Sequence, residues 1–313
     1  MKSIFSNKKV IITGHTGFKG SWLSLWMNML GADLYGISLS VPTKPSHFEF
    51  LDLNFKQDIR IDISKSKQID KIINDIQPDF IFHLAAQPLV GKSYTDPLFT
   101  FSTNIMGTVS ILDSLRKLKK ECIAVIITSD KSYLNQEINR GYNENDKLGG
   151  NDPYSGSKGA TELVIYSYFQ SFFKDSNIKI GVGRAGNVIG GGDWADNRII
   201  PDAIKSLETK NKLIIRNPNA TRPWQHVLEP LSGYIALALD LKTSKINNGN
   251  VFNFGPSSIC NFTVQDILLE LKNSFINLEW VVDKKINYKE ATLLSLDCSK
   301  AEKFLEWRST LDF

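Results

Sequence analysis

A tyrosine and a lysine lie four residues apart in the stretch DPYSGSKGATEL, as Tyr154 and Lys158. On a helix this spacing places both side chains on one face. A nearby ammonium group favours the phenolate, so the spacing predicts that Lys158 lowers the pKa of Tyr154 and prepares it to take a hydroxyl proton as a general base. An exposed contact between residues one helical turn apart is the simpler alternative.

A second polar cluster ends the β-branched run at residues 123–129 and reads TSDKSY. It places the hydroxyl of Ser129, the carboxyl of Asp130 and the amine of Lys131 in succession at the end of an expected strand. A hydroxyl, an activated tyrosine and a bound nicotinamide together make an alcohol-oxidising site. A polar turn at the end of a strand is the alternative interpretation of these three residues.

Three glycines, Gly14, Gly17 and Gly20, separate the expected strand KVIIT from a tryptophan-rich helix. Glycine permits a tight turn and lets a pyrophosphate approach the helix N-terminus, where free N–H groups favour an anion. The pattern predicts a dinucleotide loop, and a glycine turn without a ligand is the alternative. The stretch after the second expected strand, GISLSVPTKP, contains no acid, so it does not choose between NAD and NADP.

Other candidates follow the third and fourth expected strands. Asp62 is a candidate for binding the adenine amino group, and a helix-capping role beside Ser64 explains it equally well. Ala85 and Ala86 have small side chains that let a cofactor pass closely over the strand end, and tight packing of the sheet is an equally compatible explanation.

These residues must be positioned by short apolar strands that alternate with helices through the first half of the chain. The pattern predicts strands at residues 9–13, 33–38, 59–63, 79–86, 123–129 and 178–184, and helices at 21–30, 64–76, 97–118 and 153–174. Buried strands without polar alternation, separated by helices, predict an α/β fold with a doubly wound parallel Rossmann sheet. Ligands bind such sheets outside the carboxyl ends of the strands, where the candidate residues lie.

The alternation becomes irregular after about residue 185. We therefore expect a dinucleotide-binding domain over residues 1–185 and a mostly substrate-binding, smaller region over residues 186–313, with the chain crossing back between them.

The composition is that of a globular protein, with 313 residues, 42% hydrophobic and 22% charged, and a net charge of +4. The small net charge argues against a nucleic-acid partner, and no apolar run reaches membrane-spanning length. The cysteines, Cys122, Cys260 and Cys298, are odd in number and far apart, so we expect no disulfide framework, no metal site and a cytoplasmic setting.

Over nearly its whole length the chain resembles the extended short-chain dehydrogenase/reductase family. The stretches that carry the resemblance are TGHTGFKGSWLSLW, HLAAQPLV, TNIMGTV, TSDKSY, GYNENDKLGGNDPYSGSKGATELV, RAGNVIGGGDWADNRIIPD, IIRNPNATRPWQHVLEPLSGY and LDCSKA. The last four point to the CDP-sugar 4,6-dehydratase branch. The resemblance implies a homodimer that carries out an NAD-dependent, redox-neutral dehydration of CDP-D-glucose to CDP-4-dehydro-6-deoxy-D-glucose.

The resemblance also implies catalytic roles. Tyr154 would take the proton of the sugar C4 hydroxyl, which Ser129 would hold, and Lys158 would bind the nicotinamide ribose. Asp130 would protonate the departing C6 hydroxyl. Lys131 stands where the related dTDP-glucose enzymes carry a glutamate base; it would act as the base at C5 if its pKa is lowered, or otherwise stabilise the enolate.

The expected binding residues form two sets. Those implied for the cofactor are Gly14, Thr16, Gly17, Phe18, Lys19, Gly20, Asp62, Ile63, Leu84, Ala85, Ala86, Gln87, Asn104, Thr128, Tyr154, Lys158 and Arg184. Those implied for the sugar nucleotide are Asn187, Trp194, Arg198, Arg222 and His226. The arginine fork fits phosphate oxygens, although a surface ion pair explains each arginine alone and core packing explains His226. Asn104 supports the site or is simply a buried polar residue.

Two departures from the family pattern stand out. Gly91-Lys92 replaces an arginine that the family tends to carry soon after PLV, which bears on substrate identity. Family members usually continue with another helix beyond LEWRSTLDF, so we expect exposed apolar surface on the smaller region.

Two other functions fit the glycine loop. A nucleotide-sugar 4-epimerase would share the loop and the tyrosine–lysine pair, but usually has small residues in place of Asp130 and Lys131. A non-catalytic nucleotide-sensing protein would keep the loop but typically lacks Tyr154 and Lys158.

Overall fold

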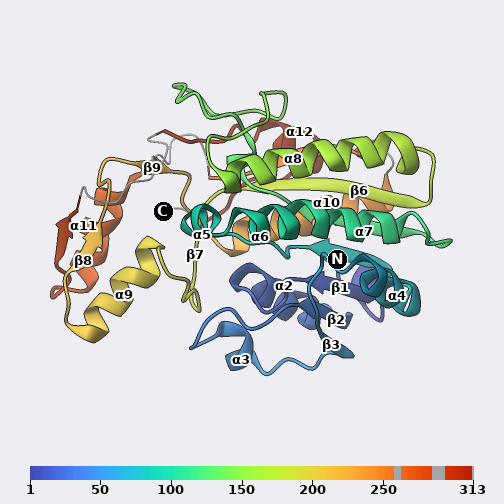
Figure 1. The fold of residues 1–313 in the computed structure, drawn as a ribbon, viewed down its shortest axis with the longest axis horizontal. Helices are drawn as coiled ribbons and strands as arrows, with labels where there is room; N and C mark the ends of the chain where they lie inside the picture. Colours follow the sequence, from blue (N-terminus) through green and yellow to red (C-terminus); the bar gives the residue numbers. More distant parts are fainter. Residues whose placement is uncertain (245, 257–261, 284–292, 312–313) are drawn as a thin grey trace.

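A seven-stranded parallel sheet is the centre of the computed structural model, which describes residues 1–244, 246–256, 262–283 and 293–311 (Figure 1). The strand order is β11-β6-β5-β4-β1-β2-β3. The strands are β1 (Lys9–Thr13), β2 (Asp33–Ser38), β3 (Gln57–Arg60), β4 (Phe80–His83), β5 (Cys122–Ile127), β6 (Ile178–Ala185) and β11 (Val251–Phe254). This order confirms the expected doubly wound sheet: strands β1 to β3 follow one another toward one edge and β4 to β6 toward the other, so the winding reverses between β1 and β4.

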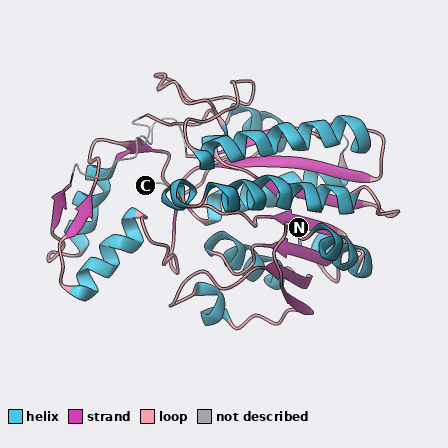
Figure 2. Ribbon diagram, in the orientation of Figure 1, coloured by secondary structure: helices cyan, strands magenta, loops and turns pink. Residues whose placement is uncertain are grey.

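Helices cover both faces of the sheet (Figure 2). Successive side chains of β1 point to opposite faces, because Val10 and Ile12 join one apolar cluster and Ile11 joins the other. The first cluster includes residues of α2 (Phe18–Met29), α10 (Leu228–Thr243) and α12 (Ser299–Leu305). The second includes residues of α4 (Ser66–Ile76), α7 (Gly107–Leu115) and α8 (Pro153–Tyr168). Burial on both faces explains why the strands lack polar alternation.

Several predicted boundaries shift. The strand expected at 59–63 is β3 at Gln57–Arg60, which ends there because its partner β2 ends at Ser38, opposite Arg60. The helix expected from residue 21 begins at Phe18. The helix expected at 97–118 is α6 (Pro97–Phe101), the π-helix η1 (Ser102–Met106) and α7, and the helix expected at 153–174 is α8 followed by the π-helix η3 (Phe169–Phe173).

The region after β6 divides between the sheet and a separate cluster of elements. Helix α10 and strand β11 return to the sheet, and β11 is a strand that the sequence pattern did not predict. Figure 1 shows α9 (Ile199–Thr209), β8 (Leu213–Ile215) and α11 (Val264–Ser274) apart from the sheet, where with β13 (Trp280–Val282) they enclose a small core of Ala203, Leu213, Ile215, Leu268 and Leu278.

The remaining elements are short. They are α1 (Lys2–Phe5), α3 (His47–Leu51), α5 (Val90–Thr95), the 3-10 helix η2 (Asp130–Ser132), and the strands β7 (Val188–Ile189), β9 (Thr221–Arg222), β10 (Gln225–His226) and β12 (Phe262–Thr263). Within the described ranges, no helix is both long and apolar enough to cross a bilayer. Of the cysteines, Cys122 and Cys298 are free, and Cys260 lies outside the described residues.

Candidate active site

The glycine loop forms a narrow backbone turn between β1 and α2. Gly14 has φ +73°, and a Cβ there would lie 2.8 Å from the backbone nitrogen of Ala85. A Cβ on Gly20 would lie 2.0 Å from the carbonyl oxygen of Gly14, so no other residue fits this position. Gly17 is the N-cap of α2 and offers no side chain to the first helical N–H groups. The turn therefore leaves backbone donors available for an anion.

A cleft of about 720 Å³ opens beyond this loop, at the carboxyl ends of the strands. Its volume is within the range of small-molecule sites. All but two of the residues expected to contact the cofactor line it: Gly14, Thr16, Gly17, Phe18, Lys19, Gly20, Asp62, Ile63, Leu84, Ala85, Ala86, Gln87, Thr128, Tyr154 and Lys158. Ser129, Asp130, Lys131, Asn187, Arg198 and Arg222 line it as well.

Helix α8 carries the tyrosine and the lysine into the cleft. Its first turn is fixed by Pro153 at N1 and by Asp152, whose carboxylate accepts a hydrogen bond from the backbone of Ser155. Both Tyr154 and Lys158 are buried, at 8% and 6% exposure. Burial lowers the pKa of Lys158 to about 8, against the opposing charge of Glu162.

The predicted lowering of the tyrosine pKa is wrong for this structure. Burial raises the pKa of Tyr154 to about 12, although a hydrogen bond with Ser129 and the charge of Arg198 both oppose the rise. The prediction counted one neighbouring charge and omitted the cost of placing a phenolate in a buried site.

Asp130 is the most deeply buried acid of the cleft, at 2% exposure. One carboxyl oxygen accepts a hydrogen bond from Ser129 Oγ at 2.8 Å, and the other, Oδ2, has no partner among the described residues. A Cβ on Gly186 would lie 2.8 Å from Oδ2, so the glycine leaves room for this oxygen. Burial raises the pKa of Asp130, while Ser129 and the charge of Lys131 oppose that rise. The group is therefore suited to hold a proton that it can donate.

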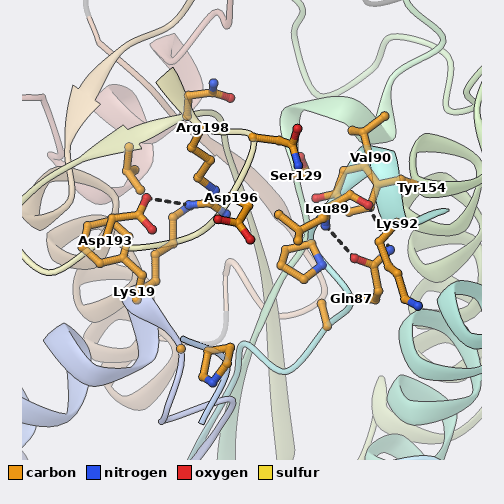
Figure 3. Close-up of a pocket in the computed structure, with 18 of the residues that line it drawn as sticks. Lys19, Gln87, Leu89, Val90, Lys92, Ser129, Tyr154, Asp193, Asp196 and Arg198 are labelled. Carbon is orange, nitrogen blue, oxygen red and sulfur yellow. Dashed lines mark hydrogen bonds and ion pairs between the residues drawn. The ribbon is translucent and has the colours of Figure 1, made fainter. Parts of the chain in front are cut away.

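Figure 3 shows polar and charged side chains on opposite sides of the cleft. Lys19, Asp193 and Arg198 lie on one side, and Ser129 and Tyr154 lie toward the other. Arg198 donates to Asp193 at 3.0 Å, and burial lowers the pKa of Lys19 to about 8, with the charge of Arg198 adding to the effect. Asp193, the acid that binds Arg198, was not predicted from the sequence, although it lies in the GGGDW stretch that carries the family resemblance.

Arg184 does not reach the cleft, although the sequence placed it with the cofactor. Its guanidinium is 2% exposed and forms a buried ion pair with Glu162, whose carboxylate also accepts from Thr128 Oγ1 at 2.7 Å. Arg184 also lies over the ring of Tyr133, 4.5 Å from its centroid. Glu162, one turn beyond Lys158, was not singled out because its partner is distant in sequence.

Asn104 also lies behind the cleft rather than on its wall. Its side chain accepts from the backbone N–H of Gln87 at 2.8 Å and donates to Ser157 Oγ at 2.8 Å. Its carbonyl accepts from Thr108 Oγ1, which contacts the buried ring of His83. Asn104 therefore joins the strand end that carries Gln87 to the helix that carries Tyr154.

Two expected sugar-nucleotide residues are not among those that line the cleft. Trp194 uses its carbonyl to accept from Lys205 Nζ at 2.8 Å. The imidazole of His226 accepts from the backbone N–H of Leu228 and meets Trp22 edge-on. A second tryptophan, Trp224, lines the cleft instead.

The family model described as GDP-mannose 4,6 dehydratase matches residues 11–313 of this chain. The chain belongs to the GDP-mannose 4,6-dehydratase family. Within that family it is 47% identical to the CDP-glucose 4,6-dehydratase of Salmonella typhimurium, over 98% of this chain and 87% of that protein.

Solved structures of epimerases and dehydratases share the fold of this family member. DesIV, a dTDP-glucose 4,6-dehydratase from Streptomyces venezuelae solved with NAD and TYD, superposes with a TM-score of 0.80 at 20% identity, over 97% of this chain and 93% of that one. A UDP-glucuronic acid 4-epimerase from Bacillus cereus, solved with UDP-glucuronic acid and NAD, gives 0.82 at 24% identity, over 97% and 95%.

We predict that Lys158→Met makes this dehydratase-family chain more stable at pH 7 while abolishing turnover. The pKa of Lys158 in the folded chain is about 8, below its ordinary value of 10.5. Burying the protonated amine on folding at neutral pH therefore lowers the stability of the protein by a free energy on the order of 3 kcal/mol. Between about pH 8 and pH 10.5 the unfolded chain binds more protons at Lys158 than the folded chain, so the stability of the wild type rises with pH in this range. The stabilisation by Lys158→Met should therefore shrink as the pH rises. Thermal unfolding at pH 7 and pH ~10 measures both effects.

The exposed Lys174 provides the control, because Lys174→Met should change stability by less than about 0.5 kcal/mol. Glu162 keeps Arg184 as its partner in the Lys158 variant. A Lys158→Met protein that is less stable than wild type at pH 7 would contradict the prediction.

Proposed function

We propose that the chain converts CDP-D-glucose to CDP-4-dehydro-6-deoxy-D-glucose and water, with NAD as cofactor. The observation that carries the proposal is the carboxyl group of Asp130, buried beside Ser129 with Oδ2 unpartnered in the described structure. Dehydration needs an acid at the departing hydroxyl, whereas 4-epimerisation expels no hydroxyl and needs no such acid. The 47% identical CDP-glucose 4,6-dehydratase supports CDP as the nucleotide.

The glycine cradle supports NAD as the cofactor. Gly14 and Gly20 leave backbone space that any side chain would fill, at a helix N-terminus suited to a pyrophosphate. Asp62, Ala85 and Lys158 line the same cleft as this loop. NAD, when bound, supplies a hydride acceptor and donor, so that oxidation at C4 and reduction at C6 cancel.

Ser129 and Tyr154 would act at the C4 hydroxyl. Ser129 holds the hydroxyl, and Tyr154 receives its proton as the C–H bond at C4 breaks. With a pKa of about 12, Tyr154 is a phenol at neutral pH, so its action as a base depends on cationic neighbours in the complex. Lys158 lies one helical turn away and provides such a charge when protonated.

Asp130 and Lys131 would act after the C4 ketone has formed. The ketone acidifies the proton on C5, and its loss together with the C6 hydroxyl gives an enone and water. Burial raises the pKa of Asp130, which favours the protonated form that donates to the departing hydroxyl. Lys131, at the partly exposed edge of the cleft, would take the C5 proton or stabilise the enolate.

We also infer a cytoplasmic homodimer. Apolar side chains remain exposed along α6, η1, α8 and η3: Leu98, Met106, Leu163, Tyr166 and Phe172. Such a surface on packed neighbouring helices fits a second copy of the chain, because a contiguous apolar patch is costly in water. Sedimentation equilibrium would give a single-chain mass if this inference is wrong.

The test of the proposed function is incubation with CDP-glucose and NAD, followed by detection of the alkaline chromophore of a 4-keto sugar. The control is Tyr154→Phe, which should reduce turnover by at least about 100-fold because the general base is lost. An epimerase would instead give CDP-galactose without the chromophore, and a sensor would give no turnover.

Asp130→Asn should separate the two halves of the reaction. The variant is expected to form reduced cofactor at nearly the wild-type rate in a single turnover, while elimination slows by about 10²- to 10⁴-fold. Absorbance of the reduced cofactor follows the first half, and release of the 4-keto product follows the second. Asp175→Asn, on the exposed surface, is the control and should leave both rates unchanged. An equal fall in both rates would exclude the acid role.

A further inference from the structure

A turn of three glycines, Gly190–Gly192, leads from β7 to the charged side of the cleft. It is followed directly by Asp193, whose carboxylate accepts from Arg198 at 3.0 Å. Gly192 has φ +84°, and a Cβ on Gly191 would meet no atom within 4 Å. Glycine loses more conformational freedom on ordering than any other residue, so this turn depends on contacts from elsewhere in the molecule.

Those contacts come from the dinucleotide-binding half. The indole of Trp22, on the second turn of α2, donates from Nε1 to the carbonyl of Gly191 at 3.0 Å. Its ring stacks on His47, with centroids 4.7 Å apart and planes inclined by 23°. The ring of His47 lies against Gly192, because a Cβ there would be 2.5 Å from the side chain of His47.

His47 is itself fixed to the start of α2. Its Nδ1 lies 2.8 Å from Ser21 Oγ, and that hydroxyl donates its only proton to the carbonyl of Phe18. Nδ1 must therefore carry the hydrogen in this bond. The imidazole is held in one orientation by the same helix that carries Trp22.

The opposite side of the turn is held by β10. Strand β7 pairs with β10 in parallel, and the N–H of Val227 donates to the carbonyl of Ile189 at 2.8 Å. His226, at the end of β10, meets Trp22 edge-on with centroids 6.5 Å apart. The glycine turn thus lies between β10 and α2, and Trp22 of α2 contacts both the turn, at Gly191, and His226 of β10.

We propose that Trp22 is a positioning residue for the sugar nucleotide, acting through the carbonyl of Gly191 to keep Asp193 and Arg198 directed into the cleft. The inference rests on the proposed function and on the expectation that Arg198, which lines the cleft, contacts the sugar nucleotide. Trp22 is not among the residues that line the cleft. Its helix begins at the dinucleotide loop, so it connects the two halves of the site without belonging to either binding surface.

The test compares Trp22→Phe with wild type. Phenylalanine retains a ring against His47 but cannot donate to Gly191, and a lost hydrogen bond of ~1 kcal/mol corresponds to a change of about fivefold. We expect about fivefold weaker CDP binding by calorimetry and a similar rise in KM for CDP-glucose. The affinity for NAD and kcat should stay within about twofold, a split that general destabilisation of the fold would not produce.

Trp26→Phe is the matched control, because Trp26 lies one turn further along α2 and packs against the hydrophobic core. It should leave CDP binding unchanged. Gly192→Ala is a second variant that strains the turn directly, since φ +84° disfavours alanine and His47 blocks its methyl group, and it should weaken CDP binding at least as much as Trp22→Phe.

The outcomes separate this inference from the proposed function. Unchanged CDP affinity in Trp22→Phe, or an equal loss of CDP and NAD affinity, would overturn the positioning role. A wild-type protein that binds CDP but does not convert CDP-glucose contradicts the proposed function alone. A wild-type protein that binds no CDP contradicts both.

Discussion

The buried carboxylate of Glu162 fixes the spacing on which the candidate active site depends. Its carboxylate accepts hydrogen bonds from the hydroxyl of Thr128, next to Ser129, and from the guanidinium of Arg184 on the neighbouring strand β6. Glu162 itself lies on α8, the helix that carries Tyr154 and Lys158. Removing one partner of such a pair typically costs 3–5 kcal/mol, because the other charge stays buried. The contacts of Glu162 with Thr128 and Arg184 therefore help to fix the relative positions of Ser129, Tyr154 and Lys158, although none of these three residues takes part in them.

The same burial determines which protonation states the site prefers. It raises the pKa of Asp130 and Tyr154 and lowers the pKa of Lys158 and Lys19, so each group is moved toward its neutral form. A charged form that the chemistry needs, such as the phenolate of Tyr154, must therefore be stabilised by its neighbours. The glycine at position 186 contributes by leaving space for a carboxyl oxygen rather than by any chemistry of its own.

Local sequence predicts well what local geometry determines. The glycine loop, the Tyr154–Lys158 turn and the polar end of β5 depend on spacing within a few residues, and all of them line the cleft. Arg184 and His226, which the sequence analysis placed with the ligands, are not among the residues that line the cleft, and their contacts with Glu162 and Trp22 could not be foreseen because these partners lie far away in the chain. Strand β11 was missed because four residues between irregular segments carry little periodicity, and the tyrosine pKa was wrong because burial is a tertiary property.

The late position of β11 has a consequence for synthesis of the protein. Strand β6 is buried along all eight of its residues, yet its outer neighbour is residues Val251–Phe254. Until that segment leaves the ribosome, the nascent sheet presents an apolar edge with unpaired N–H and C=O groups, the kind of surface that recruits other extended chains. Tyr133, which bonds Asn253 at 2.7 Å, also lacks its partner until then. The polypeptide is therefore most prone to aggregation after its dinucleotide half has been made and before its last sheet strand has joined.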